Sequence, residues 1–459
     1  MSRCIIVYDV RSMYPAIVIG DNISPEMKMV QEVMGERVVK FRKKPMGLIP
    51  KVVKLSLDAR DTYRDLRLNA IDEKSRDKYA GMEKSAKVGA NATYGVMLYP
   101  PFRLYDKDCA DAITRAGRRI IRRLYAKCLK QNIEAPKLRG LIEEVLYGDT
   151  DSIFILLNCK WSDMQSINLI SAYLTAELKL LCHELGYTEE VEGKVERVLD
   201  RLFFKFRPAK SAERNHAIDV GGRLVVGAKK KYAGRCRWIE GKGNVNEKYI
   251  KGFGRSDISV YTKKVYEGLW DAILEQGDIN AAIKLLRKAW VEVNRQSWYA
   301  ISVPRGVKAD FGEYTEDSLS HGHIAATLYM IENFGIEYNP MVKPRTVCVR
   351  PKLLGGAKRN LPITKRIALL NGAEEPPALV KREFEIDYEE QAEAILKKPF
   401  ELIVVSLGRQ WSEVSTGTRQ LTLDVAFTEA KVQREELDSK LEDQFQQILQ
   451  NPPSNTYKG

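Results

Sequence analysis

Two aspartates stand two residues apart in the stretch "LYGDTDSIFILL", where the surrounding residues are mainly apolar. Asp149 and Asp151 precede an apolar run from Ile153 to Leu157 that predicts a buried strand, and Gly148 indicates a turn. The sequence therefore predicts a tight hairpin with both carboxylates at its tip. Two like charges this close repel each other and are costly to desolvate, so a bound cation would explain the pattern.

A third carboxylate, Asp9, ends the apolar run "CIIVYDV". Three aspartates at strand ends, with no His or Cys ligand pattern nearby, favour magnesium or manganese over zinc. Mg²⁺ takes further ligands from substrate phosphates, and two ions about 4 Å apart suit nucleotidyl transfer. On its own, D-x-D is also found in metal-dependent glycosyltransferases that use sugar nucleotides, and turn aspartates can simply cap a hairpin.

A polar stripe is predicted in "KVGANATYG", near the end of a helix. Lys87, Asn91 and Tyr94 are spaced i, i+4 and i+7 and therefore share one helix face. These side chains could hold phosphates, a sugar and a base edge. The preceding helix offers Arg60 and Arg64 at i and i+4, a cationic pair suited to a triphosphate. The alternative is an exposed charged helix pair with Tyr94 packed at its base.

The elements that must position these groups combine strands and helices, which predicts an α+β fold with a mixed sheet backed by helices. A buried strand carries Asp9, and two early helices form an antiparallel hairpin with a short polar turn near "DEKSRDKYAG". From about Asp257 the pattern becomes mainly helical. The predicted early elements cover residues 3–10, 55–84, 82–94, 111–131 and 161–186.

Composition indicates a globular chain with an uneven charge distribution. The 459 residues are 44% hydrophobic, enough for two or more domains, and the formal net charge is +13. Fifteen basic and five acidic residues lie between Arg201 and Val260, which predicts a polyanion-binding region, although a solvated basic face has the same composition.

The cysteines and apolar runs bear on location. The seven cysteines show no zinc-type spacing, and their odd number argues against a closed disulfide framework, so a reducing compartment is expected. No apolar run approaches the roughly 18 residues of a membrane span, and the N-terminus lacks the form of a signal peptide. We expect a cytoplasmic, nucleoid-associated protein, or a nuclear one in a eukaryote, with no membrane partner.

Together these motifs resemble B-family DNA polymerases. "DVRSMYP", "KVGANATYG" and "YGDTDS" resemble the family's motifs A, B and C in order, "KKKY" its basic duplex-binding motif, and "KGFGRSD" its entry to the thumb. The resemblance implies a right-hand polymerase, with a palm of mixed or antiparallel sheet, helical-hairpin fingers and a mainly helical thumb. The implied boundaries are palm 1–50 and 99–256, fingers 51–98, thumb 257–427 and a C-terminal helical tail 428–459.

The resemblance also implies a role for each motif residue. Asp9 and Asp149 would bind two Mg²⁺ ions, with Mn²⁺ as an alternative, while Asp151 lies beside them and the Val10 carbonyl is a further ligand. The implied contacts to the incoming deoxynucleoside triphosphate are Ser12, Met13, Tyr14, Arg60, Arg64, Lys87, Asn91 and Tyr94, with Tyr14 excluding a 2′-hydroxyl. The implied contacts to primer-template DNA are Gly95, Thr150, Lys229, Lys230, Lys231, Tyr232, Lys251 and Arg255.

The implied activity is template-directed addition of deoxynucleotides to a primer 3′-hydroxyl. The family carries an N-terminal domain and an exonuclease domain before motif A, which begins here at Asp9, so we expect no proofreading in this chain. An excised fragment, a chain split between genes with an upstream subunit as its partner, and a naturally short polymerase are the three alternatives. "RQLTLDVAF" partly resembles a sliding-clamp peptide anchored by Gln420, Leu423 and Phe427. An ordinary amphipathic segment fits it equally, and a non-catalytic DNA-binding or assembly subunit is the alternative for the whole chain.

Overall fold

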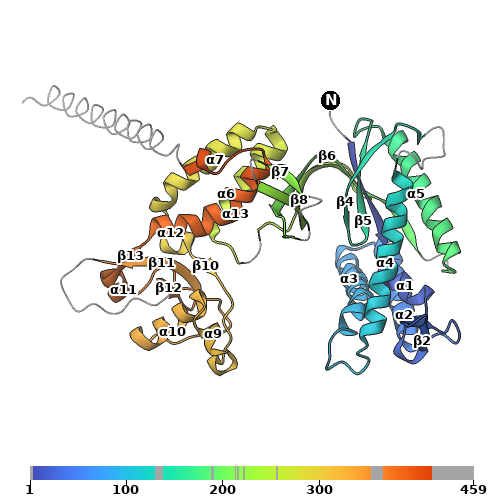
Figure 1. The fold of residues 1–459 in the computed structure, drawn as a ribbon, viewed down its shortest axis with the longest axis horizontal. Coiled ribbons are helices and arrows are strands. Elements are labelled where there is room, and N and C mark those ends of the chain that lie inside the picture. The colour runs from blue at the N-terminus through green and yellow to red at the C-terminus, as the bar shows by residue number, and fades with distance from the viewer. Residues whose placement is uncertain are drawn as a thin grey trace, which may run out of the picture. The chain divides into compact units, whose positions relative to one another are not determined.

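The structure, a computed structural model, describes residues 4–129, 138–187, 191–211, 213, 217–220, 223–254, 257–352 and 365–415. The chain divides into two compact units, coloured by residue number in Figure 1. Unit 1 is Met1–Leu202 with Gly234–Tyr249, and unit 2 is Phe203–Ala233 with Ile250–Gly459. The predicted clamp peptide, the predicted tail helix and Arg255 lie outside the described residues. The palm, fingers and thumb boundaries stay predictions.

Unit 1 is built on an antiparallel sheet in the strand order β4-β5-β1-β6, and helices α4 and α5 pack together beside it (Figure 1). The sequence prediction of a strand through Asp9 and of a hairpin at Asp149 to Asp151 is confirmed. The strands of unit 1 are β1 (Cys4–Arg11), β2 (Lys28–Val33), β3 (Glu36–Phe41), β4 (Ile142–Asp149), β5 (Ser152–Leu157), the first part of β6 (Glu192–Pro208), the last part of β8 (Arg223–Ile239) and β9 (Gly243–Lys251).

Five helices complete unit 1, and acidic residues begin three of them. The side chains of Asp72, Asp106 and Asp163 each accept a hydrogen bond from a backbone N–H in the first turn of the helix that follows. The helices are α1 (Met13–Gly20), α2 (Leu48–Leu68), α3 (Glu73–Val96), α4 (Lys107–Cys128) and α5 (Met164–Glu184).

The predicted helical hairpin is confirmed, because α2 and α3 pack against each other over their lengths. The predicted bounds of its two helices, 55–84 and 82–94, are wrong. The chain turns between Leu68 and Glu73, since Asp72 caps α3 by accepting from the Ser75 N–H. The sequence "DEKSR" is thus the capped start of the second helix rather than a loop.

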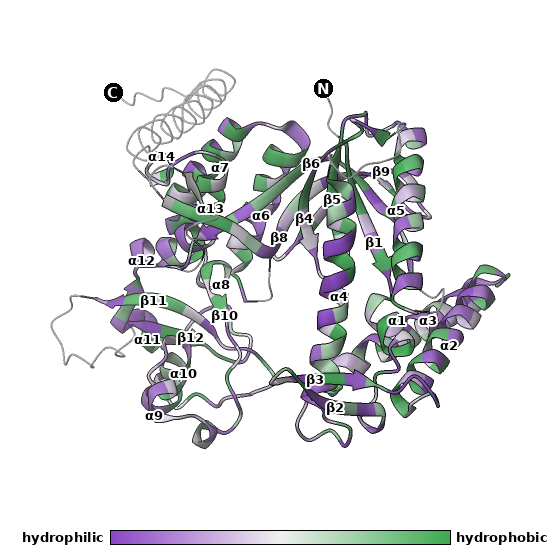
Figure 2. Ribbon diagram, turned by 45° about the vertical axis from the view of Figure 1, so that its right-hand side comes forward, coloured by the Kyte–Doolittle hydropathy of each residue, from purple (hydrophilic) through white to green (hydrophobic). Residues whose placement is uncertain are grey.

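The amphipathic pattern predicted for the helix at residues 111–131 is also confirmed. Along α4, Ile113, Ile120 and Leu124 are buried in the core of unit 1, while the arginines of the opposite face are exposed. Figure 2 shows this as alternating hydrophobic and hydrophilic bands. No helix in the described part of the chain is both long enough and apolar enough to cross a membrane.

A close contact sets the pairing of β1 with β6. The Tyr8 ring is fully buried, and its hydroxyl lies 3.0 Å from the Thr175 hydroxyl of α5. A Cβ atom at Gly193 would lie only 2.2 Å from the Tyr8 hydroxyl oxygen, so a larger residue there would have to displace the buried Tyr8 ring or β6 itself. The next residue, Lys194, is therefore held directly across from Asp9.

Unit 2 contains helices and a second, smaller antiparallel sheet of β10, β11, β12 and β13. The region after Asp257 was predicted to be mainly helical with a mixed segment at residues 343–363; β11 lies in that segment, and the strands of this sheet are two to seven residues long. The elements are β7 (Ile218–Val220), α6 (Val260–Trp270), α7 (Ile279–Glu292), α8 (Trp298–Ile301), β10 (Val303–Pro304), α9 (Glu316–Leu319), α10 (Gly322–Phe334), β11 (Arg345–Pro351), β12 (Arg366–Leu369), α11 (Ala378–Glu383), β13 (Phe384–Ile386), α12 (Tyr388–Ala392), α13 (Lys398–Ser406) and α14 (Ser412–Ser415).

Candidate active site

A cavity of about 390 Å³ in unit 1 brings together side chains from the three sequence motifs. The sheet, the start of α1 and the α2–α3 hairpin all contribute to its lining. The predicted residues that line it are Asp9, Ser12, Met13, Tyr14, Arg60, Arg64, Lys87, Asn91, Thr150 and Asp151. They come from positions up to 142 residues apart in the chain.

Strand pairing places the carboxylates next to one another. On β1, Asp9 pairs across with Ser152 of β5, and Ser152 pairs on its other side with Asp149 of β4. Directly opposed residues of antiparallel strands point to the same face, so Asp9 and Asp149 project from one face of the sheet. The Val10 N–H donates to the Asp151 carbonyl oxygen at 2.8 Å, which fixes the β4–β5 turn beside motif A.

The three carboxylates differ in exposure. Asp9 and Asp151 are half-buried and line the cavity, whereas Asp149 is only 7% exposed and does not line it. The Asp149 carboxylate lies 3.4 Å from the hydroxyl of Thr150, and the backbone of Thr150 has a φ of 62° in the turn. Within the described ranges no group of three or more His, Cys, Asp and Glu side chains is arranged to hold a metal ion. The metal roles of the aspartates and of the Val10 carbonyl stay predictions.

The aromatic side of the site is formed by Tyr14, Tyr94 and a glycine of α4. The two tyrosine rings have centroids 5.2 Å apart and are tilted by 46°. A Cβ atom at Gly117 would lie 3.0 Å from Tyr14 Cε1 and 2.9 Å from Met13 Cε, so the absence of a side chain lets both residues pack against α4. Burial raises the pKa of the Tyr14 hydroxyl, and neighbouring Tyr94 and Asp151 raise it further, which keeps the hydroxyl neutral.

The basic residues of the site come from the two hairpin helices. Arg60 is 7% exposed, and its guanidinium donates to the Ser12 hydroxyl at 2.8 Å and to Asp61 at 2.9 Å. Arg64 is half-buried and Lys87 exposed, and neither forms an ion pair with a described residue. Both line the cavity, so their charges are available to an anionic ligand.

Ser12 connects these groups to motif A. Its backbone adopts a left-handed conformation, with φ 49° and ψ 38°, at the junction between β1 and α1. Left-handed backbone is uncommon for a residue other than glycine, and such strain is often stored at functional sites. The conformation brings the Ser12 hydroxyl to Arg60, so motif A is hydrogen-bonded to α2.

The predicted DNA contacts of the KKKY and KGFG motifs lie together in unit 2. Lys229 and Lys230 are exposed and Lys231 is half-buried, whereas Tyr232 is fully buried with the Lys251 ammonium 6.0 Å from its ring centroid. A Cβ atom at Gly252 would lie 2.1 Å from the Lys230 carbonyl oxygen, and Gly252 has a φ of +76°. Only glycine fits this approach. Gly95 is exposed near the end of α3, and all these DNA roles stay predictions.

Several cavity residues were not predicted from the sequence. Arg67 extends the Arg60 and Arg64 face by another turn and pairs with Glu83 of α3 at 2.8 Å, so its helical spacing could have revealed it. Lys194 forms an ion pair with Glu240 beside Asp9. No local pattern signals that pair, because it depends on the register between β1 and β6. Arg11 and Glu196 also line the cavity.

Comparison with known proteins identifies relatives. The sequence model of DNA polymerase family B matches residues 1–202. DNA polymerase 2 of Aeropyrum pernix is 27% identical over 359 residues, which cover 74% of this chain and 37% of that protein. A DNA polymerase of Archaeoglobus fulgidus is 33% identical over 151 residues, covering 32% of this chain and 18% of the relative. The chain thus spans well under half the length of these curated relatives.

A solved structure, the family B DNA polymerase from the hyperthermophilic archaeon Pyrobaculum calidifontis, is similar over 88% of this chain and 44% of that one, with 20% sequence identity and a TM-score of 0.49. The matched residues 1–202 contain motifs A, B and C, and they supply nearly all of the cavity described above. Residues 1–202 of the chain thus match the DNA polymerase family B model, and the relatives named above are archaeal DNA polymerases.

Proposed function

We propose that this chain carries the polymerising centre of a template-directed DNA polymerase, which adds deoxynucleotides to a primer 3′-hydroxyl with release of pyrophosphate. The observation that carries the proposal is the cavity in which Asp9 and Asp151 meet Arg60, Arg64 and Lys87. Carboxylates near phosphate-binding cations are the combination that nucleotidyl transfer needs.

In this proposal the cations of the hairpin hold the triphosphate. Arg64 and Lys87 offer a guanidinium fork and an ammonium to the phosphate oxygens, and Arg60 exchanges part of its contact with Ser12 and Asp61 for phosphate. Asn91 lies on the Lys87 face and can hydrogen-bond the ligand. These side chains then largely position the α-phosphate for attack by the primer 3′-hydroxyl.

The sugar would lie against Tyr14. Its ring is fixed by Tyr94 and by the close approach to Gly117, so it cannot withdraw freely to make room for a 2′-hydroxyl. This rigidity supports the expectation that Tyr14 selects deoxyribose. Tyr94 in turn would meet the nascent base pair.

We infer that Mg²⁺, or Mn²⁺, is the cofactor. Asp9, Asp149 and Asp151 with the Val10 carbonyl would hold it, and this set of hard oxygen donors on neighbouring strands fits such ions. Such an ion would take further ligands from the triphosphate and water. When bound, the ion neutralises developing charge and activates the attacking oxygen.

The proposed anatomy assigns the α2–α3 hairpin to the fingers, residues 1–50 and 99–256 to the palm, and residues 257–427 to the thumb. Lys229, Lys230 and Lys231 would contact the phosphates of the primer-template duplex without reading its sequence. An upstream subunit and a sliding clamp are the proposed protein partners. Adding each partner separately to a primer-extension assay of the chain would test whether it increases extension.

A primer-extension assay with Mg²⁺ tests the function directly. We expect Asp9→Asn to lower the rate of extension at least about a hundredfold, because it removes a charge from the reacting centre. Binding of primer-template DNA, followed by fluorescence anisotropy, should change little. Asp58→Asn is the matched control, since Asp58 is an exposed aspartate of α2 that does not line the cavity. DNA binding without extension by the unmodified chain would instead indicate a non-catalytic subunit.

A further inference from the structure

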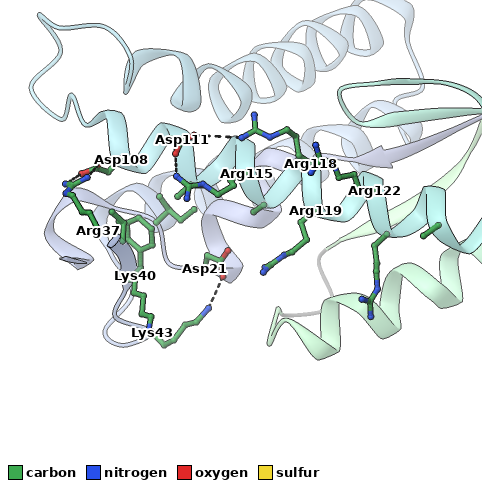
Figure 3. A pocket seen from close by; sticks show the side chains of 17 residues that line it. Asp21, Arg37, Lys40, Lys43, Asp108, Asp111, Arg115, Arg118, Arg119 and Arg122 are labelled. Carbon is green, nitrogen blue, oxygen red and sulfur yellow. Dashed lines mark hydrogen bonds and ion pairs between the residues drawn. The ribbon is translucent and has the colours of Figure 1, made fainter. Parts of the chain in front are cut away.

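A second and larger cavity in unit 1, about 960 Å³, is strongly basic. We call it the arginine groove. Helix α4 contributes five exposed arginines to it, and Figure 3 labels four of them along one side of the helix. The facing side is formed by β3, the loop after it and the end of α1. The five arginines are Arg115, Arg118, Arg119, Arg122 and Arg123.

The groove keeps an excess of positive charge after its internal ion pairs are counted. Asp111 pairs with Arg115, Asp108 with Arg37 at 2.7 Å, and Asp21 with Lys43 at 3.1 Å, as the dashed lines of Figure 3 show in part. These three aspartates are the acidic residues of the lining. Lys40, Arg119 and Arg122 form no ion pair with a described residue.

The spacing of the arginines suits an extended polyanion. They recur at i, i+3, i+4, i+7 and i+8 from Arg115, so each turn of α4, about 5.4 Å of rise, presents another guanidinium to the groove. A guanidinium binds phosphate oxygens through two parallel hydrogen bonds, which favours a phosphodiester chain over scattered carboxylates. Val39 and the half-buried Phe41 ring line the same groove and give an unpaired base an apolar contact.

The arginine groove and the candidate active site share α4. Gly117 packs against Tyr14, and the next residue, Arg118, is close enough to lower the pKa of that tyrosine. Burial raises the pKa of Tyr14 by more than Arg118 lowers it. The effect of Arg118 on Tyr14 nevertheless connects the two sites electrostatically through one helix. A nucleic-acid strand that leaves the active site therefore meets a basic path beside it.

We propose that the arginine groove binds single-stranded DNA that flanks the primer-template junction. The inference rests on the proposed function for the identity of the polyanion as DNA. An unpaired strand fits better than a duplex, because Val39 and Phe41 can contact a base only when it is not paired. The groove then holds the template beside the site and adds to affinity without taking part in the chemistry.

Equilibrium binding of a fluorescent oligo-dT and of a blunt duplex tests the proposal. The groove variant carries Lys40→Gln, Arg119→Gln and Arg122→Gln. We expect its affinity for oligo-dT to fall about tenfold, and the slope of log K against log salt to decrease by about 2, because three phosphate contacts are lost. Its affinity for the blunt duplex should change less than about twofold.

A charge-matched control carries Lys160→Gln, Lys179→Gln and Lys284→Gln, three exposed lysines that do not line the groove. It should bind oligo-dT like the unmodified chain. Equal oligo-dT affinity of the groove variant and the control would overturn the proposal. Competition by a polyglutamate peptide as effective as that by an oligonucleotide of equal charge would also overturn it, in favour of an acidic protein partner.

Binding in this assay needs neither nucleotide nor Mg²⁺. A failure of the groove proposal would therefore leave the primer-extension result unaffected, and a chain inactive in extension could still lose oligo-dT affinity through the groove substitutions. Thermal unfolding of both triple variants checks that the exposed substitutions leave the fold intact.

Discussion

Tyr14, a proposed nucleotide contact, is restricted on two sides of its ring. Tyr94 lies against its ring, and Gly117 of α4 approaches its edge. The consequence is that Tyr14 can be displaced from a distance, by a change in a helix that makes no contact with the nucleotide in our proposal. Sugar selection should therefore depend on α4 as well as on motif A.

We expect Gly117→Ala to weaken discrimination against ribonucleotides, because the new methyl group would meet Tyr14 Cε1 at 3.0 Å and Met13 Cε at 2.9 Å and push the ring from its place. Tyr14→Ala should weaken the discrimination further. Single-turnover incorporation of a deoxynucleotide and of the matching ribonucleotide measures both effects, and a loss on the order of tenfold corresponds to about 1.4 kcal/mol.

Gly81→Ala is the matched control for that experiment. Gly81 also lies within a helix, but a Cβ atom there would meet no other group within 4 Å. Alanine should stabilise α3 by up to about 1 kcal/mol without changing sugar discrimination. Unchanged discrimination in Gly117→Ala would show that Tyr14 is not held by this contact.

At the scale of the elements, α4 packs against Tyr14 through Gly117 and lines the arginine groove with its arginines. Its cap, Asp106, accepts hydrogen bonds from the N–H groups of Asp108 and Cys109 and also pairs with Lys28 of β2. One side chain thus starts the helix and ties it to the β2–β3 hairpin. Because α4 borders both the candidate active site and the arginine groove, its first turn should influence both.

We expect Asp106→Ala to lower the free energy of unfolding by about 1–2 kcal/mol, since the helix loses its cap and Lys28 loses one of its two ion-pair partners, keeping Asp108. Asp106→Asn should cost less, because an asparagine can still cap the helix while it gives up the ion pair. Urea denaturation of the three proteins measures the difference. Equal losses for the two variants would assign the stabilisation to the ion pair rather than to the cap.

Sequence pattern predicted the elements whose signals are local. The apolar face of α4 and the hairpin at Asp149 to Asp151 are readable along the chain, and both elements are present, although Gly148 lies within β4 and the turn is at Thr150 and Asp151. The bounds of α2 and α3 were misplaced because the cap at Asp72 was read as part of a loop. The short strands of the unit 2 sheet, two to seven residues long, were too short for a periodic signal.

At the scale of the whole molecule, the stability of the chain depends on a lysine buried in unit 2. In unit 2, Lys205 of β6 is 7% exposed, and its ammonium donates to the Pro399 carbonyl oxygen at 2.9 Å. Burial, with some repulsion from Lys231, lowers the pKa of Lys205 to about 8. Keeping this lysine charged therefore costs folding free energy at neutral pH.

The sign of the resulting pH dependence follows from proton binding. Between pH 8 and about 10.4 the unfolded chain holds more protons at Lys205 than the folded chain, so stability rises with pH in that window. We expect the difference in unfolding free energy between Lys205→Met and the unmodified chain to shrink by on the order of 2–3 kcal/mol as pH increases through this range. Urea denaturation at several pH values measures it.

The exposed residue Lys284 provides the control. The unfolding free energy of Lys284→Met should differ from that of the unmodified chain by an amount independent of pH. A pH-independent difference for Lys205→Met as well would mean that Lys205 keeps an ordinary pKa in the folded chain. Because the comparison is between variants, the titration of all other groups cancels.

The residues of the candidate site were predictable to the extent that motifs carry them. Asp9, Tyr14, Arg60 and Lys87 were all predicted, and one cavity brings them together. Lys194 was not, because it reaches the cavity through pairing between strands almost two hundred residues apart, which no local pattern encodes. The relation among separate carboxylates likewise depends on strand register rather than on spacing along the chain.

The bare backbone at Gly193, beneath the Tyr8 hydroxyl, has a consequence for how this protein tolerates change. If any larger residue there shifted β6 by one position, Lys194 would turn to the other face of the sheet and leave the neighbourhood of Asp9. Glycine at position 193, which has no Cβ atom, thus keeps Lys194 in the cavity beside Asp9. Screens that alter only polar side chains would overlook one of the positions on which the chemistry depends.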